Sequence, residues 1–151
     1  MGAKIKGAGS SQIEIEGVKQ LKDVSYNIMS DRIEAGTFLC IAAMNHSNII
    51  VKNIDEDHII PIIDKLEEAG CELQIEDRQI QIKATKKLKS VNIKTMPYPG
   101  FPTDMQSIFA TLLTTAKGSS IIVENIFENR YKYTQELIRM GAKISVEGKT
   151  A

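Results

Sequence analysis

One carboxylate in this chain stands where a catalytic base could be held. Asp104 follows Thr103 at the expected start of a helix, directly after the sequence Pro-Tyr-Pro-Gly-Phe-Pro of residues 97–102. Prolines and a glycine restrict the conformations of a loop, and plain helix capping does not require them. The helix dipole alone also favours an acidic residue in a first turn. The pattern leaves two interpretations of Asp104 open: a stabilising first-turn acid, or a positioned functional carboxylate.

Arg130 is the cation that could bind an anion near this loop. It ends the sequence Phe-Glu-Asn-Arg of residues 127–130, which follows an apolar strand pattern ending at Ile126. A guanidinium group can bind a phosphate or a carboxylate through two parallel hydrogen bonds. A surface arginine at a helix start would show the same spacing, so that alternative also stays open.

The sequence offers few other reactive side chains. Cys40 and Cys71 lie in apolar patterns, which are typical of small buried side chains rather than of a nucleophile or a disulfide. His46 and His58 have no second ligand at metal-binding spacing. We therefore expect neither a metal site nor a cofactor.

Charge and hydropathy argue against nucleic-acid and membrane partners. The chain has 19 basic and 19 acidic residues, so no net charge attracts it to nucleic acid or to an acidic membrane. The densest basic run, Lys86, Lys87 and Lys89, fits a solvated turn better than a phosphate-binding groove. No stretch approaches the ~18–20 apolar residues that cross a bilayer, and no signal peptide opens the chain.

An internal repeat supplies the elements that must position the candidate residues. Residues 47–54 read Ser-Asn-Ile-Ile-Val-Lys-Asn-Ile, and residues 119–126 read Ser-Ser-Ile-Ile-Val-Glu-Asn-Ile. The match extends into the flanking segments, and a period of about 70 residues suits a duplicated small α/β unit rather than a solenoid. Only the second copy carries the 97–102 insertion, and the first has Arg32 where the second has Asp104.

Each copy is predicted to fold as strand, strand, helix, strand, helix, strand, an α/β (α+β) arrangement. Alternation of polar and apolar residues predicts strands at 12–16, 24–28, 79–83 and 91–95. Continuous apolar runs at 49–51 and 121–123 are typical of strands covered on both faces. A hairpin is expected where 73–76 pairs with 79–82.

Two helices are predicted in each copy. The first helices, of about 12 residues, follow the patterns Asp31-x-x-Glu34 and Thr103-x-x-Gln106, which fit capping boxes. The more amphipathic second helices span 59–69 and roughly 131–140. Each is followed by a glycine that can adopt the left-handed conformation of a helix end, Gly70 and Gly141.

The two ends of the sequence indicate a longer parent. The opening Met-Gly-Ala-Lys-Ile recurs at 140–144, where a second helix ends, and the predicted strand at 144–147 has almost no return strand. Natural domains rarely leave such an edge uncovered. We therefore expect a segment of a longer protein, whose exposed strand edges could cause self-association.

Three motifs resemble one known family. Residues 29–38 (Met-Ser-Asp-Arg-Ile-Glu-Ala-Gly-Thr-Phe), 96–106 (Met-Pro-Tyr-Pro-Gly-Phe-Pro-Thr-Asp-Met-Gln) and 126–144, which include Phe-Glu-Asn-Arg, closely resemble UDP-N-acetylglucosamine 1-carboxyvinyltransferase, or UDP-N-acetylglucosamine enolpyruvyl transferase. The resemblance covers essentially the whole chain, as a middle segment of that enzyme. It implies repeated βαβαββ units of the inside-out α/β barrel type in two domains. Residues 1–28 would complete one domain up to a hinge, 29–96 would form the first unit of the other domain, and 97–151 a second, truncated unit.

The resemblance also implies a reaction. The family transfers the enolpyruvyl group of phosphoenolpyruvate to the 3′-hydroxyl of UDP-N-acetylglucosamine and releases phosphate, the committed step of peptidoglycan synthesis in the bacterial cytoplasm. Asp104 matches the proposed general base, which also binds the sugar. Ile126 matches a residue whose backbone contacts the nucleotide sugar, and Arg130 an arginine on the phosphoenolpyruvate side. Asp31 and Arg32 match the hinge motif.

The same comparison limits what these residues do alone. The family's loop cysteine, a general acid, matches neither Cys40 nor Cys71, so we expect the segment by itself to be inactive. The related 5-enolpyruvylshikimate-3-phosphate synthase typically has a Ser-rich segment where this chain has Asp-Arg-Ile-Glu-Ala-Gly, and it ranks well behind. A non-catalytic α/β binding or scaffold module is the remaining alternative. Zero net charge and the lack of a basic, aromatic sheet face argue against an RNA-binding version of it.

Overall fold

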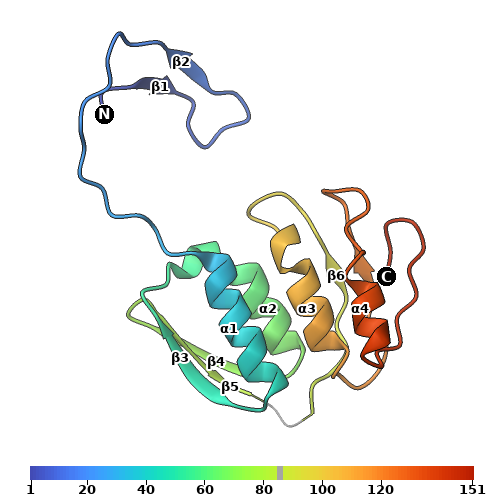
Figure 1. Cartoon of the computed structure of the whole chain (residues 1–151). Helices are drawn as coiled ribbons and strands as arrows, with labels where there is room; N and C mark the ends of the chain where they lie inside the picture. The colour runs from blue at the N-terminus through green and yellow to red at the C-terminus, as the bar shows by residue number, and fades with distance from the viewer. Residues whose placement is uncertain (85–86) are drawn as a thin grey trace.

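The computed structural model describes residues 1–84 and 87–151, so Lys86 of the predicted basic run lies outside the described residues. Helices and short strands alternate along the chain, which confirms the mixed α/β class predicted from the sequence. Most of them pack into one body, and an N-terminal hairpin stands apart from it (Figure 1).

A three-stranded antiparallel sheet has the strand order β3-β5-β4. Its strands are β3 (Asn48–Lys52), β4 (Glu72–Glu76) and β5 (Gln79–Lys83), and β4 and β5 form the predicted hairpin. Asp77 and Arg78 turn that hairpin with φ values of 47° and 59°. Positive φ at both central residues is the geometry that tight two-residue hairpins favour.

The sheet buries only one of its faces. Ile80 and Ile82 of β5 are completely buried, whereas Ile50 on the opposite face of β3 is 51% exposed. The prediction that the run 49–51 is covered on both faces is therefore wrong. Neighbouring side chains of a strand point to opposite faces, and the described helices cover only one of them.

Helices α1 (Arg32–Met44) and α2 (Ile60–Glu68) cover that face and pack on each other. Asp31 caps α1, because its carboxylate accepts hydrogen bonds from the amides of Ile33 (2.7 Å) and Glu34 (3.3 Å). A 3₁₀ turn at Glu56–His58 leads into α2, which ends before Gly70 with its φ of 100°. Both predicted helices of the first copy are confirmed.

The second unit packs its helix α3 (Gln106–Leu113) beside α1, as Figure 1 shows. Two short parallel strands, β6 (Ile93–Lys94) and β7 (Ile122–Val123), run next to α3. Helix α4 (Thr134–Arg139) follows and is shorter than the predicted span of 131–140. Ile121 is 51% exposed, so the second apolar run is not covered on both faces either.

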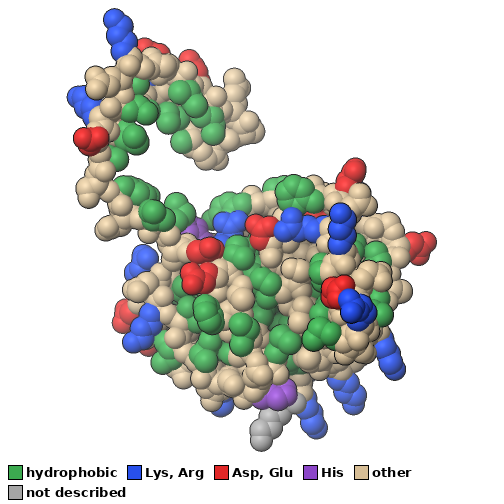
Figure 2. Space-filling model, in the orientation of Figure 1, with side chains coloured by type: hydrophobic (Ala, Val, Ile, Leu, Met, Phe, Trp, Pro, Cys, Tyr) green, Lys and Arg blue, Asp and Glu red, His purple; other side chains and the backbone are tan. Residues whose placement is uncertain are grey.

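Apolar side chains from both units form one core cluster, which includes Leu39 of α1, Leu66 of α2 and Phe109 of α3. Not all apolar side chains are inside it. Hydrophobic groups also gather on the outer face over α1 and α3 (Figure 2), and Phe38 and Ile41 of α1 are about half exposed, at 50% and 48%.

The N-terminal hairpin pairs β1 (Lys4–Lys6) with β2 (Glu14–Glu16). Its second strand lies within the strand predicted at 12–16, and its first strand was not predicted. The strand predicted at 24–28 is absent: that segment is extended but pairs with no strand among the described residues, and Tyr26 and Ile28 are 71% and 89% exposed. Alternation predicts which strand a segment can form, but a strand needs a hydrogen-bonding neighbour.

Candidate functional site

Asp104 is carried by a turn that follows a closed loop. The amide of Met96 donates to the carbonyl of Phe101 (3.0 Å), and the amide of Gly100 donates to Pro97 (2.8 Å). The Phe101 ring is 5% exposed and packs edge-on against Phe109 of α3, with centroids 5.4 Å apart. The insertion is therefore anchored to the core directly before the turn that bears Asp104.

That turn is the 3₁₀ helix η2 (Thr103–Met105), and its last residue, Met105, anchors it to the core. Met105 is completely buried against Gly36 of α1, where an added Cβ would come within 2.9 Å of the Met105 Cε. A residue larger than glycine at position 36 would push on Met105. Close approach of α1 and η2 thus holds the turn in place, while the Asp104 side chain remains 62% exposed.

The structure brings Asp104 and Arg130 together. Arg130 Nη2 lies 2.6 Å from Asp104 Oδ1, although the two residues are 26 positions apart in the chain. The Arg130 guanidinium also lies over the Phe127 ring, 5.1 Å from its centroid. In this structure Asp104 is therefore paired with Arg130 and is largely exposed.

Ile126, the third predicted substrate residue, has its amide already engaged. The N–H groups of Ile126 and Phe127 both donate to Glu124 Oε1, at 2.8 and 3.1 Å. A backbone contact between Ile126 and a ligand would therefore have to use its carbonyl oxygen as an acceptor. Such an acceptor suits a sugar hydroxyl or an amide N–H.

Glu124 is a functional candidate that the sequence reasoning did not single out. Its side chain is 1% exposed, and Oε2 accepts a hydrogen bond from Thr103 Oγ1 at 2.8 Å. Thr103 was predicted to cap a helix with Gln106, and this prediction is wrong because the Thr103 hydroxyl bonds to Glu124 instead. The signal was present in the repeat: Lys52 is the matching residue of the first copy, a charge reversal within an otherwise similar eight-residue motif.

The two hinge candidates lie at the start of α1. Asp31 is its N-cap, and Arg32 lies over the ring of Tyr98 in the inserted loop, 5.4 Å from the centroid. Tyr98 in turn contacts the His58 ring edge-on, with centroids 6.2 Å apart. Arg32 therefore joins the first unit to the loop of the second, and it does not meet Asp104 in any described ion pair.

The described residues were also compared with the requirements of a reactive thiol, a metal site and a membrane-spanning helix. Cys40 and Cys71 are buried, and burial together with the neighbouring Cys71 raises the pKa of Cys40 to about 12. No cluster of three metal-ligating side chains occurs in residues 1–84 and 87–151. No helix in those ranges is long and apolar enough to cross a bilayer.

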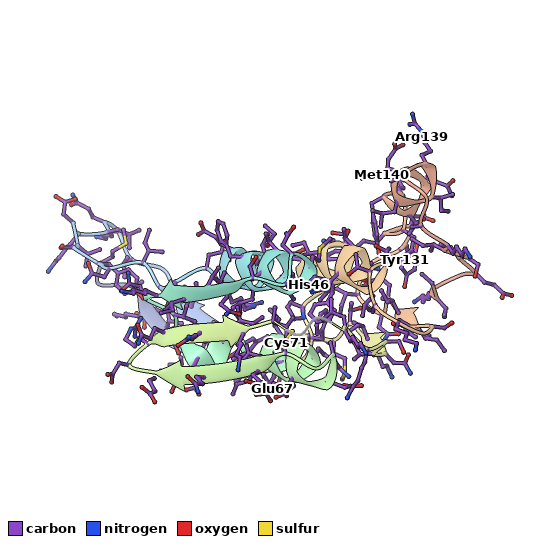
Figure 3. The ribbon with its side chains drawn as sticks, turned by 90° about the horizontal axis from the view of Figure 1, so that it is seen from below. His46, Glu67, Cys71, Tyr131, Arg139 and Met140 are labelled. Carbon is purple, nitrogen blue, oxygen red and sulfur yellow. The ribbon has the colours of Figure 1, made fainter. Side chains whose placement is uncertain are left out.

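A hollow of about 550 Å³ lies away from these residues. Leu113 of α3, Tyr133 and the segment 141–145 line it, and Asp104 and Arg130 do not. Tyr131 lies where α4 joins the body, and its hydroxyl donates to the carbonyl of Ile122 at 2.8 Å. Figure 3 shows α4 standing away from the body, with Arg139 and Met140 at its outer end.

Comparison with known proteins identifies the family of this chain. The family model described as EPSP synthase (3-phosphoshikimate 1-carboxyvinyltransferase) matches residues 1–151. The chain belongs to this family.

Curated relatives narrow the resemblance. UDP-N-acetylglucosamine 1-carboxyvinyltransferase 1 of Caldanaerobacter subterraneus subsp. tengcongensis is 50% identical over 151 residues, 100% of this chain and 36% of that protein. The UDP-N-acetylglucosamine 1-carboxyvinyltransferase of Desulfofundulus thermocisternus is 50% identical over 152 residues, 63% of its length. The resemblance inferred from the motifs is confirmed. The chain therefore spans about a third of the length of the Caldanaerobacter relative, 36%.

A solved structure supports the fold. The enolpyruvyl transferase NikO from Streptomyces tendae superposes with a TM-score of 0.79 over 99% of this chain and 36% of its own, at 24% sequence identity. At that identity the similarity establishes the fold alone. The predicted enolpyruvyl transferase fold is thereby confirmed.

Proposed function

We propose that this chain is part of an enzyme that transfers the enolpyruvyl group of phosphoenolpyruvate to the 3′-hydroxyl of UDP-N-acetylglucosamine, releasing phosphate, in peptidoglycan synthesis. The observation that supports it most directly is the 2.6 Å approach of Arg130 to Asp104. The two were predicted as site residues from separate motifs. The names of relatives that are about half identical to the chain support the same reaction.

Asp104 is proposed as the general base. Transfer requires the 3′-hydroxyl to lose its proton as its oxygen bonds to the enolpyruvyl carbon, and a carboxylate within about 3 Å can accept that proton. The buried side chains of Phe101 and Met105 anchor the chain on either side of Asp104, so the turn η2 can keep such a carboxylate in a defined place. Placement of this kind increases the rate, because positioned groups lose less translational and rotational entropy in the reaction step.

Arg130 is proposed to bind the phosphate of phosphoenolpyruvate, and in this structure it is paired with Asp104 instead. The pair is partly exposed, with side-chain exposures of 33% for Arg130 and 62% for Asp104. Exposed ion pairs are worth only about 0–1 kcal/mol, so a bound substrate can separate the two groups at little cost. The Arg130 fork is then available to the phosphate and the Asp104 carboxylate to the hydroxyl.

Ile126 is proposed to bind the nucleotide sugar through its carbonyl oxygen, since Glu124 already takes its amide. Asp31 and Arg32 are proposed to lie at the hinge that follows residues 1–28. The contact of Arg32 with Tyr98 gives that hinge a connection to the loop before Asp104.

A ligand-observed NMR titration with UDP-N-acetylglucosamine tests the proposal. We expect saturable contact with the wild-type chain and its loss in Asp104→Asn, because the amide oxygen is a weaker hydrogen-bond acceptor than the carboxylate and the amide NH₂ can only donate. Glu136→Gln is the matched control: it also removes one exposed carboxylate from an ion pair, here with Arg139 on α4. Equal binding by all three proteins would contradict the role of Asp104, and no binding by any would favour a scaffold module.

A further inference from the structure

Glu124 is an acidic side chain in a place where acids are rarely found. It follows β7 and is 1% exposed, whereas its counterpart Lys52 is an exposed residue of β3. Charged side chains are almost never fully buried unless they are paired or fully hydrogen-bonded. Glu124 makes no ion pair with a described residue, so its hydrogen bonds must compensate for its burial.

Four donors converge on the two oxygens of this carboxylate. Oε1 accepts from the Thr95 hydroxyl at 2.8 Å and from the amides of Ile126 and Phe127 at 2.8 and 3.1 Å. Oε2 accepts from the Thr103 hydroxyl at 2.8 Å. The Thr95 hydroxyl also accepts from the amide of Asn125 at 2.9 Å, which extends the network to the end of β6.

Three of the four donors come from the two segments that carry the candidate site, and the fourth, Thr95, follows β6. Thr103 is the first residue of η2, directly before Asp104, and Ile126 and Phe127 begin the segment that leads to Arg130. One oxygen is bonded to the Asp104 turn and the other to the Arg130 segment. A rigid carboxylate group therefore sets the separation of two segments that share no strand or helix.

The first copy of the repeat has Lys52 in place of this carboxylate. Lys52 cannot accept hydrogen bonds, and Asn53 after it adopts a φ of 61°, so the chain leaves β3 by a different turn. The first copy also lacks the inserted loop and has Arg32 where Asp104 stands. The carboxylate, the loop and the candidate base thus occur together in one copy and are absent together from the other.

We propose that Glu124 is a positioning residue, which holds the Asp104 turn and the Arg130 segment at the separation seen here. The importance of that separation for catalysis rests on the function proposed above, but the positioning itself is a property of the folded chain. Glu124 is not expected to touch a substrate, because its side chain is buried.

The test removes one hydrogen bond at a time and follows Arg130. Thr103→Val deletes the hydroxyl that binds Oε2, and the side-chain ¹⁵N–¹H signals of Arg130 report its pairing with Asp104 without any ligand. Asp104→Asn defines the signals of unpaired Arg130. We expect Thr103→Val to move the Arg130 signals towards those of Asp104→Asn, and Thr103→Ser to restore the wild-type position because serine keeps the hydroxyl.

A matched control separates positioning from general loss of a threonine hydroxyl. Thr111→Val removes a hydroxyl that donates to the Ser107 carbonyl within α3, so the Arg130 signals should stay unchanged. Thr103→Ala is the second variant if valine disturbs folding, which the amide spectrum reveals. Arg130 signals that remain at the wild-type position in folded Thr103→Val or Thr103→Ala would overturn the proposal.

Affinity for UDP-N-acetylglucosamine supplies the second measurement. We expect about a tenfold loss in Thr103→Val, the order expected for one hydrogen bond to a charged group, and recovery in Thr103→Ser. Absence of binding by the wild type would count against the proposed function only, since the Arg130 signals decide the positioning role independently. Tenfold weaker binding without any change at Arg130 would overturn the positioning role and leave the proposed function intact.

Discussion

Glu124 experiences two opposing effects on its protonation. Burial disfavours the charged carboxylate and by itself raises the pKa, while the amides of Ile126 and Phe127 and the hydroxyls of Thr103 and Thr95 stabilise the charged form. The hydrogen bonds prevail, and the pKa of Glu124 lies below its ordinary value of 4.5. A carboxylate with a lowered pKa in the folded state stabilises the fold only while it is ionised.

The pH dependence of stability should therefore report Glu124. Its contribution is fully present above the unfolded pKa of about 4.5 and is lost as the pH falls through the lower folded value. We expect Glu124→Gln to lower the free energy of unfolding by about 1–3 kcal/mol at neutral pH, the cost of disrupting hydrogen bonds to a buried charged group. Urea unfolding from pH 7 to pH 3 measures the difference between the two proteins.

The difference in free energy of unfolding between the wild type and Glu124→Gln should shrink as the pH falls below about 4.5, because Glu124 of the wild type then also becomes neutral. Glu136→Gln is the control, since Glu136 is exposed on α4 and should show a small difference at every pH. A Glu124→Gln deficit that is constant from pH 7 to pH 3 would show that its charge does not stabilise the fold.

The two long first helices of the repeat begin in different ways. Asp31 caps α1 through two amide hydrogen bonds, whereas α3 has no side-chain cap and continues directly from the η2 turn. Thr103 is available to Glu124 because it is released from capping. The start of α3 thus contributes less to its own helix and more to the placement of Asp104.

Asp31→Ala should destabilise the chain by about 1 kcal/mol, the usual cost of losing an N-cap side chain. The two amides that Asp31 satisfies, those of Ile33 and Glu34, would then rely on water. The urea midpoint at neutral pH measures the effect. Asp31→Asn should retain most of the stability because asparagine caps equally well, and equal losses in both variants would show that charge rather than capping matters.

Both thiols of the chain are buried in the core. Cys40 lies inside α1 and Cys71 directly before β4, both within the core, and the pKa of Cys40 is raised by burial to about 12. Neither can serve as a solvent-accessible general acid at neutral pH. Asp104 and Arg130 are the proposed base and anion-binding group, but the residues described here offer no such acid beside them.

We therefore expect a polypeptide of these 151 residues to release no measurable phosphate from phosphoenolpyruvate and UDP-N-acetylglucosamine. A steady-state phosphate-release assay measures this, with a full-length enzyme of the family run in parallel as the positive control. A rate comparable with that of the full-length enzyme would show that the chain contains every group the reaction needs.

The sequence by itself determined the repeat and many of the elements of this protein. Helix α1 with its Asp31 cap, the β4–β5 hairpin across Asp77 and Arg78, and α2 before Gly70 all follow from local patterns, since caps, turns and periodicity involve residues a few positions apart. The family motifs likewise identified Asp104, Ile126 and Arg130 as residues to examine.

Only the tertiary structure decided which distant groups meet. It paired Asp104 with Arg130, and it bonded Thr103 to Glu124 instead of to its predicted cap partners. It also left Ile50 on an open face of the sheet. The physical reason is the same in each case: a hydrogen bond or a covered face depends on which segments pack together, and residues more than 20 positions apart carry no local pattern that specifies their contact.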